Sequence, residues 1–353
     1  MAEKFYKKEY IFGEKGSLKL LNRGPAEEYI EEMLDKLLLA SNIQEESKIK
    51  LEIFKNFKEI YEYDLVNATI PEPFGYFKDD NIKKEFIAKH LWIQEMALYL
   101  GDFFANYHEK RYLKTKTMPR IIIPLTMINY TEMYYKAVCD YYSVILRMNY
   151  PYEITENGLE YSKNINIATS SNLFGENNQH AITATFSLPA LIEHFLIHGL
   201  QKRMIFEGLE KLNILIEQNK IILEQEDKDI VAEFMKIKNG ARIVTFKASE
   251  KYITERLYKL FISNNILMDS EDNKMILTGK RRTLGALIRS NYTKSQIKEE
   301  YMYLLESMFS VKKMNLRNNI MHGSDANFNY FSVIIVSVML EIFLAIAHEE
   351  IFI

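Results

Sequence analysis

The sequence predicts an all-α protein, and three observations lead to this prediction. The 353 residues include only 7 Pro and 13 Gly, so few positions break regular structure. Apolar residues recur with the 3.6-residue period of a helix over several long stretches. Alternating patterns typical of strands are short and fall within residues 149–186. With 48% hydrophobic and 26% charged residues, the chain has the composition of a globular protein long enough for two domains.

The first half of the chain, residues 1–150, predicts a helical domain of unassigned role. Its first 24 residues are polar and contain three glycines, which indicates an irregular arm. Pro25 then fits the first turn of a helix that has acidic residues behind it. Periodic stretches follow, with aromatic and Met positions that indicate a core; they lie at about residues 45–63, 82–107 and 128–148.

Residues 151–186 are rich in Asn and Ser and predict a linker or a small hairpin, with residues 181–186 as one alternating piece. Ser187 and Pro189 then predict the start of a long helix, which opens a C-terminal domain of residues 187–353. Thr293 and Gln296 suit the capping box of a later helix. Shorter helices are expected at about residues 227–238, 251–266, 284–290 and 295–311.

The stretch from residue 331 to residue 346 is almost entirely apolar, but it contains Glu341. A membrane-spanning helix needs about 20 apolar residues, and a carboxylate near its centre costs several kcal/mol. We therefore expect a helix buried in a bundle or in a dimer interface, and no membrane partner. The N-terminal residues lack the apolar run of a signal peptide, which favours a cytoplasmic location.

Several classes of protein receive no support from the sequence. The single cysteine, Cys139, cannot form a disulfide framework or a cysteine-based zinc site, and its neighbours predict a buried helical thiol. There is no Gly-rich phosphate loop and no Gly-x-Ser-x-Gly nucleophile element. His194 and His198 have the spacing of metal ligands on a helix, but no third ligand lies nearby. A partly buried helix is favoured there, and neither a metal nor a cofactor is expected.

The charge of the chain is uneven. The net charge of −3 does not indicate a nucleic-acid-binding protein as a whole. From residue 280 to residue 317, however, nine basic residues stand against three acidic ones, and a local basic face can bind phosphates. A solvated, lysine-rich helix face remains the alternative. The candidate RNA-binding residues are Lys280, Arg281, Arg282, Lys312 and Lys313.

A polar motif at residues 315–323, Asn-Leu-Arg-Asn-Asn-Ile-Met-His-Gly, carries the chemistry that we expect. On a helix, Asn318 and His322 share one face, and Gly323 favours a helix end just after the histidine. RNA cleavage without a metal needs a base, an acid and a cation at the phosphate. Histidine serves as base or acid near neutral pH, and arginine forks onto phosphate oxygens, so His322 and Arg317 fit these roles. The spacing of the pair is by itself a weak pattern.

The string Asn-Leu-Arg-Asn-x-x-x-His-Gly resembles the Arg-polar-x-x-x-His signature of the HEPN superfamily of nucleotide-binding and ribonuclease domains. It is most similar to an uncharacterised bacterial family of C-terminal domains. In that family a Thr-Leu-Gly element precedes the motif and an apolar helix follows it. Here Thr283-Leu284-Gly285 and residues 331–346 match those elements. The resemblance covers about residues 187–350 and leaves the N-terminal half unmatched.

The resemblance implies a HEPN-like helical bundle that forms a homodimer, with the motifs of two copies in one composite site. It implies that Arg317 binds the scissile phosphate, that His322 transfers the proton and that Asn318 is the polar residue beside them. Glu193 corresponds to an acid that faces the bundle centre in some relatives. The implied activity is metal-independent endonucleolytic cleavage of RNA to a 2′,3′-cyclic phosphate. Such domains occur in toxins and antiphage defence proteins.

Two other functions remain open at this point. Some relatives have lost catalysis, so the domain could be a non-catalytic RNA- or nucleotide-binding module. It could also be a dimeric protein-interaction scaffold, with the apolar final helix buried against a partner. For the pair itself a structural role also remains open, in which Arg317 caps helix carbonyls and His322 is a satisfied core histidine.

Overall fold

A computed structural model confirms the predicted all-α fold. It describes residues 10–12, 18–20, 26–67, 100–121, 123, 125–146, 152–155, 158–161, 176–238, 250–278, 283–310, 316 and 331–353. Helices make up most of this part of the chain. Two short antiparallel hairpins accompany them. In the first, β1 (Tyr10–Phe12) pairs with β2 (Leu18–Leu20), and in the second, β3 (Tyr152–Thr155) pairs with β4 (Gly158–Tyr161).

The helices of the first half agree with the periodic stretches where both can be compared. The first helix begins directly after Pro25, as predicted. Residues 82–99 of one expected helix lie outside the described residues. Cys139 is buried on the last helix of this half, as predicted, and burial raises the pKa of its thiol to about 11. The elements are α1 (Ala26–Leu39), α2 (Ile43–Asn67), α4 (Asp102–Thr115), a 3-10 helix (Leu125–Tyr130) and α5 (Thr131–Ile145).

The long helix α6 (Glu176–Glu217) begins well before the predicted start at Ser187. The interpretation of residues 181–186 as a linker or hairpin piece was wrong, because these residues belong to α6. Pro189 lies inside the helix, although proline removes a backbone hydrogen bond and usually marks a first turn. The helix continues through it with both flanking turns in the core, since Ala184 and Leu191 are fully buried.

The capping box predicted from Thr293 and Gln296 was also wrong. Thr293 is buried inside a short helix, and the next helix begins only at Glu299. Ile297 between them is extended and pairs with Phe352 near the end of the chain. The remaining elements are α7 (Gln225–Lys238), α8 (Glu250–Ser263), α9 (Glu271–Thr278), α10 (Leu284–Arg289), α11 (Asn291–Gln296), α12 (Glu299–Phe309) and α14 (Phe331–Ala347).

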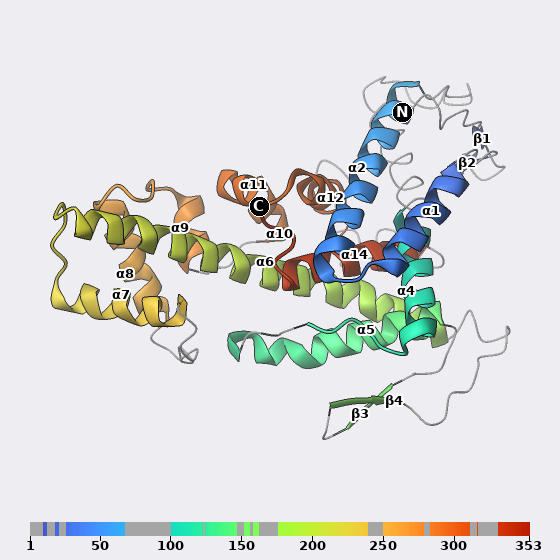
Figure 1. The fold of residues 1–353 in the computed structure, drawn as a ribbon, viewed down its shortest axis with the longest axis horizontal. Helices are drawn as coiled ribbons and strands as arrows, with labels where there is room; N and C mark the ends of the chain where they lie inside the picture. Colours follow the sequence, from blue (N-terminus) through green and yellow to red (C-terminus); the bar gives the residue numbers. More distant parts are fainter. Residues whose placement is uncertain are drawn as a thin grey trace.

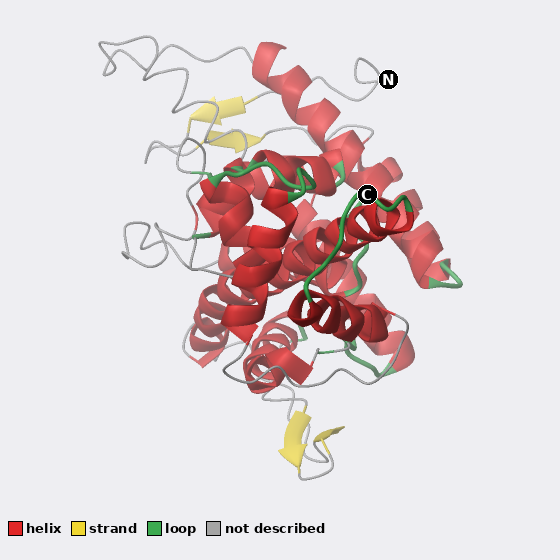
Figure 2. Ribbon diagram, turned by 90° about the vertical axis from the view of Figure 1, so that its left-hand side faces the viewer, coloured by secondary structure: helices red, strands yellow, loops and turns green. Residues whose placement is uncertain are grey.

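Helix α6 is the axis around which the other helices are arranged (Figure 1). Its first half packs against α5 and α14, and its second half packs against α7, α8 and α9. From the first half of the chain, α2 contacts α12 and α4 contacts α14, the helices near the end of the chain. The two hairpins lie outside this helical body (Figure 2).

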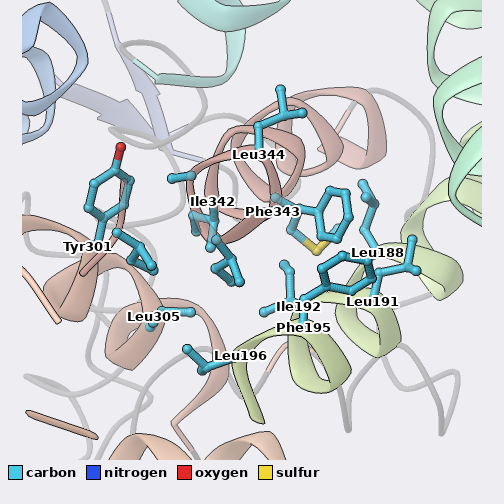
Figure 3. Close-up of a cluster of buried hydrophobic side chains, with 14 of the residues drawn as sticks. Leu188, Leu191, Ile192, Phe195, Leu196, Tyr301, Leu305, Ile342, Phe343 and Leu344 are labelled. Carbon is cyan, nitrogen blue, oxygen red and sulfur yellow. The ribbon is translucent and has the colours of Figure 1, made fainter. Parts of the chain in front are cut away.

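The apolar final helix α14 is buried within the chain, as its sequence predicts. Its residues from Val336 to Ile346 are all at most 5% exposed. Figure 3 shows side chains of α14 facing those of α6 and α12, and Phe343 meets Phe195 edge to face with ring centroids 5.0 Å apart. Within the described residues, none of the helices has both the length and the apolar character that crossing a membrane requires.

Helices of both predicted domains share one hydrophobic core. For example, Phe54 of α2 contacts Tyr301 of α12 edge to face, with ring centroids 5.3 Å apart. Tyr134 of α5 packs on Phe343 of α14 at 5.3 Å. The division of the chain into domains of residues 1–150 and 187–353 stays a prediction, since these contacts show no boundary between the two parts.

Candidate functional site

The residues predicted to act on RNA lie outside the described residues. These are Arg317, Asn318 and His322, and the basic residues Lys280, Arg281, Arg282, Lys312 and Lys313. The residue before the motif arginine is described: Leu316 is 6% exposed and belongs to the hydrophobic core. The segment thus starts from an anchored residue, after α12 and ahead of α14.

The side chain of Glu193 ties the Thr-Leu-Gly element to the long helix. The backbone N–H of Leu284, the first residue of α10, donates to Glu193 Oε2 at 2.8 Å. Glu193 comes from the first half of α6 and is partly buried. This hydrogen bond satisfies one of the free N–H groups at the start of α10 and fixes α10 against α6.

The two histidines beside Glu193 have different surroundings. His194 stacks on Tyr130, with ring centroids 4.5 Å apart. His198 lies one turn further on, and burial together with Lys202 lowers the pKa of its imidazole. Among the described residues, no group of three or more His, Cys, Asp or Glu side chains is placed to hold a metal ion.

Part of the basic stretch before the motif is engaged in contacts within the chain. Lys294 forms an ion pair with Glu306 at 2.9 Å, and Lys298 Nζ donates to the carbonyl of Glu350 at 2.6 Å. Arg289 is exposed at the end of α10. Two of the nine basic residues are thus engaged within the chain, while the net charge of the stretch is unchanged, because Glu306 is already one of its three acidic residues.

A second polar site, which the sequence did not predict, lies inside the core around Glu341. This carboxylate belongs to α14 and is 1% exposed. Lys50 Nζ from α2 lies 2.6 Å from its Oε2, and His108 Nε2 from α4 lies 2.7 Å from its Oε1. Two elements of the first half of the chain therefore meet the final helix through charged and polar groups rather than through apolar contacts alone.

The contacts continue from Glu341 toward the surface. Lys50 also forms an ion pair with Glu46 at 2.7 Å. Glu46 Oε1 accepts hydrogen bonds from Arg111 Nη1 at 3.1 Å and from the Tyr107 hydroxyl at 3.0 Å. We call the set of residues joined in this way the Glu341 cluster; it consists of Glu341, Lys50, His108, Glu46, Arg111, Tyr107 and Tyr142.

The cluster holds its charges in balance. Burial alone would raise the pKa of Glu341, but the nearby Lys50 ammonium and His108 more than offset this, so the pKa is lowered to about 2. Burial opposes the charged form of Lys50 as well, and the carboxylates of Glu341 and Glu46 override it, so the pKa of Lys50 is raised. Two carboxylates thus face two permanent cations, Lys50 and Arg111.

His108 connects the charged part of the cluster to a buried tyrosine. Its Nδ1 lies 3.0 Å from the Tyr142 hydroxyl, and burial raises the pKa of Tyr142 well above its ordinary value. The imidazole of His108 thus lies between the Tyr142 hydroxyl, beside Nδ1, and the Glu341 carboxylate, beside Nε2.

The Glu341 cluster is placed to position helices rather than to act on a substrate. His108 and Glu341 are at most 1% exposed, so no external molecule reaches them. The cluster opens toward solvent at Arg111 and Glu46, whose side chains are 36% and 17% exposed. Its buried part joins α14, the helix that follows the motif in the sequence, to α2 and α4.

Weak signals of this cluster are present in the sequence. Lys50 falls on the same face of α2 as Phe54 and Phe57, so it occupies a core position of an amphipathic helix. Glu341 interrupts an apolar stretch. A single sequence does not reveal that these two residues, far apart in the chain, are partners.

Comparison of the chain with protein-family models, with curated proteins and with solved structures gave no match. The resemblance to HEPN domains therefore rests on residues 315–323 and on the elements that flank them. The function must be argued from these residues and from the helices around them.

Proposed function

We propose that the chain is a metal-independent endoribonuclease of the HEPN type. In this proposal Arg317 binds the phosphate at the cleavage site and His322 transfers a proton. Asn318 orients the side chain of Arg317 or of His322. The observation that carries the proposal is the string Asn-Leu-Arg-Asn-x-x-x-His-Gly, which follows α12 and precedes α14 in an all-α protein.

The proposed reaction needs only groups that the motif contains. A base removes the proton of the 2′-hydroxyl, whose oxygen then forms a bond to the adjacent phosphorus. The bond from phosphorus to the 5′ oxygen breaks, and an acid protonates that oxygen, which leaves a 2′,3′-cyclic phosphate. The guanidinium of Arg317 stabilises the charge that develops on the phosphate. In a homodimer, His322 of each copy supplies one of the two proton transfers.

Two features of the described residues support this proposal. Leu316 is buried, so the chain enters the motif from a fixed point on the core. The hydrogen bond from Leu284 to Glu193 holds the Thr-Leu-Gly element against α6, the helix on which α14 also packs. The elements that accompany the motif in the family thus belong to a common bundle.

The proposal is tested by incubating the purified chain with labelled RNA in EDTA, beside Arg317→Ala and His322→Ala. We expect wild-type cleavage, with 3′ ends that resist phosphatase until the cyclic phosphate is opened. Each substitution should lower the rate by at least about a hundredfold. Arg120→Ala is the matched control, since Arg120 is exposed and lies far from the motif in the sequence, and it should cleave at the wild-type rate.

Other outcomes identify other functions. RNA binding that depends on salt and survives His322→Ala, without cleavage by the wild type, would replace the nuclease by a binding module. No affinity for RNA at any salt concentration would leave a protein-interaction scaffold. Equal cleavage by all variants would assign the activity to another site or to a contaminant.

A further inference from the structure

The Glu341 cluster joins parts of the chain that are far apart in sequence. Glu341 belongs to α14, and its two contacts come from α2 and α4 in the first half of the chain. Helix α14 begins at Phe331, a short distance after the proposed site residues Arg317 and His322. The cluster therefore lies between the N-terminal helices and the helix that continues from the proposed site.

The contacts at Glu341 resist separation more strongly than an exposed ion pair would. Glu341 is 1% exposed, and the side chain of Lys50 is 7% exposed. If α14 moved away from α2, each of these charges would stay in the core without its partner and without water. The loss of one partner from a buried ion pair is far less favourable than the loss of an exposed pair.

We propose that the Glu341 cluster is an electrostatic latch that makes α2, α4 and α14 one cooperative unit. Displacement of the N-terminal helices is then transmitted to α14, the helix that follows the proposed site in the sequence. Because the regulated residues are Arg317 and His322, the regulatory part of this inference rests on the proposed ribonuclease function. The latch itself is a property of the fold and is tested separately.

The test is hydrogen–deuterium exchange of the full chain, comparing wild type with Lys50→Met. The methionine keeps most of the volume of the side chain and removes the charge that faces Glu341. We expect exchange in peptides covering α14 to become faster by about a hundredfold, together with peptides from α2 and α4. Peptides from α8 should change much less, because α8 packs on the other half of α6.

Two further variants make the result specific to charge. Lys58→Met is the matched control: Lys58 lies on the same helix and forms an ion pair of the same length, 2.6 Å, with Glu299, which is 80% exposed. It should leave the exchange of α14 unchanged. The double variant Lys50→Met with Glu341→Gln removes both charges and should recover most of the protection that Lys50→Met loses.

Three outcomes would overturn the latch. They are unchanged exchange in α14 of Lys50→Met, equal acceleration in α14 and α8, and no recovery in the double variant. If Lys50→Met does not fold, Glu341→Gln replaces it, since Lys50 then keeps its ion pair with Glu46. Glu341→Gln should give the same pattern of faster exchange with a smaller amplitude. If this pattern were absent, the proposal would equally be overturned.

RNA cleavage by the same variants tests the regulatory part. A latch that controls the proposed site predicts that Lys50→Met changes the cleavage rate at least about tenfold, while Lys58→Met does not. An unchanged rate in Lys50→Met, with altered exchange, would remove the regulation and keep the latch. If the wild type does not cleave RNA, the ribonuclease proposal fails, and the exchange pattern still decides whether the latch exists.

Discussion

Two ionic clusters in this molecule have contacts of similar length, but the central pair of one is enclosed in the core and the central cation of the other is partly exposed. In the Glu341 cluster, Lys50 lies 2.6 Å from a carboxylate that is 1% exposed. Around the second half of α6, Arg256 of α8 contacts Asp227 at 2.5 Å and Glu226 at 2.6 Å, and the side chains of these two acids are 14% and 54% exposed. We call this set, with Glu224 at 3.5 Å, the Arg256 cluster. Burial, and not distance, separates the two.

The comparison indicates how much stability is lost when an ion pair loses one of its two partners. A carboxylate at the surface that loses its partner is solvated by water, so exposed pairs contribute about 0–1 kcal/mol. A buried carboxylate has no such alternative, and removal of its partner costs about 3–5 kcal/mol. Removal of a single partner should therefore cost more in the Glu341 cluster than in the Arg256 cluster, although the Arg256 cluster has more carboxylates around one cation.

The largest expected effect is on the free energy of unfolding of Lys50→Met. Loss of the ammonium leaves Glu341 with His108 as its remaining neighbour, and we expect a decrease of about 3–5 kcal/mol. Urea unfolding followed by circular dichroism measures it. Lys58→Met, the exposed pair on the same helix, should lose no more than about 1 kcal/mol. Equal losses in the two variants would remove the distinction between buried and exposed clusters.

The pH dependence of stability sharpens the same comparison. Folding lowers the pKa of Glu341 from 4.5 to about 2, so its ionised form adds stability above pH 4.5. This contribution is lost as the pH falls from about 4.5 through about 2, and it amounts to about 3 kcal/mol in order of magnitude. The difference in unfolding free energy between wild type and Glu341→Gln should therefore shrink over this range.

A series of urea titrations between pH 6 and pH 2, in steps of about one pH unit, provides this measurement. Glu299→Gln serves as the surface control, because Glu299 faces Lys58 in water, and its difference from wild type should vary far less with pH. A difference for Glu341→Gln that stays constant or grows toward low pH would contradict the assignment of Glu341 as a paired, ionised carboxylate.

The helical fold could be predicted from periodicity, because most helices bury one continuous apolar stripe. The buried final helix followed from its composition, and its internal Glu341 marked it as a bundle helix. Helix starts were less predictable, since local signals compete with tertiary packing. Pro189 has the sequence context of a first turn, yet core contacts on both sides carry α6 through it. Thr293 resembles a cap but is buried inside α11.

The sequence analysis missed the cap at the start of α2, although the residues that form it have a recognisable pattern. Asn42 Oδ1 accepts from the backbone N–H of Glu45 at 2.9 Å, and Glu45 Oε2 accepts from the backbone N–H of Ser41 at 2.9 Å. This is the expected chemistry of a helix start. The Glu341 cluster was not predictable in the same way, because its members come from three helices and only the folded chain brings Lys50 and His108 to Glu341.

Apolar packing, rather than charge, should decide stability around the second half of α6. A Cβ atom on Gly208 would overlap the ring of Phe261, which is fully buried between α6 and α8. Gly208→Ala should therefore destabilise the chain by about 1–3 kcal/mol, despite the better helix propensity of alanine. Thermal and urea unfolding measure this change.

Gly285 provides the matched control for that substitution. A Cβ atom there meets only the carbonyl oxygen of Phe309, at the ordinary contact distance of 3.7 Å. Gly285→Ala should be neutral or slightly stabilising, by up to about 1 kcal/mol. If Gly208→Ala were equally harmless, the close approach of α6 and α8 would not be a requirement of the fold.

The smallest effect is expected for Arg256→Met, within the Arg256 cluster itself. Its partners Glu226 and Asp227 lie in the first turn of α7, where the helix dipole already favours negative charge, and Glu224 is 84% exposed. Loss of the guanidinium should therefore cost no more than about 1 kcal/mol and should matter less as salt is added. Unfolding at low and high ionic strength tests both statements. A loss as large as that of Lys50→Met would show that three carboxylates around one half-open cation matter as much as one carboxylate enclosed in the core.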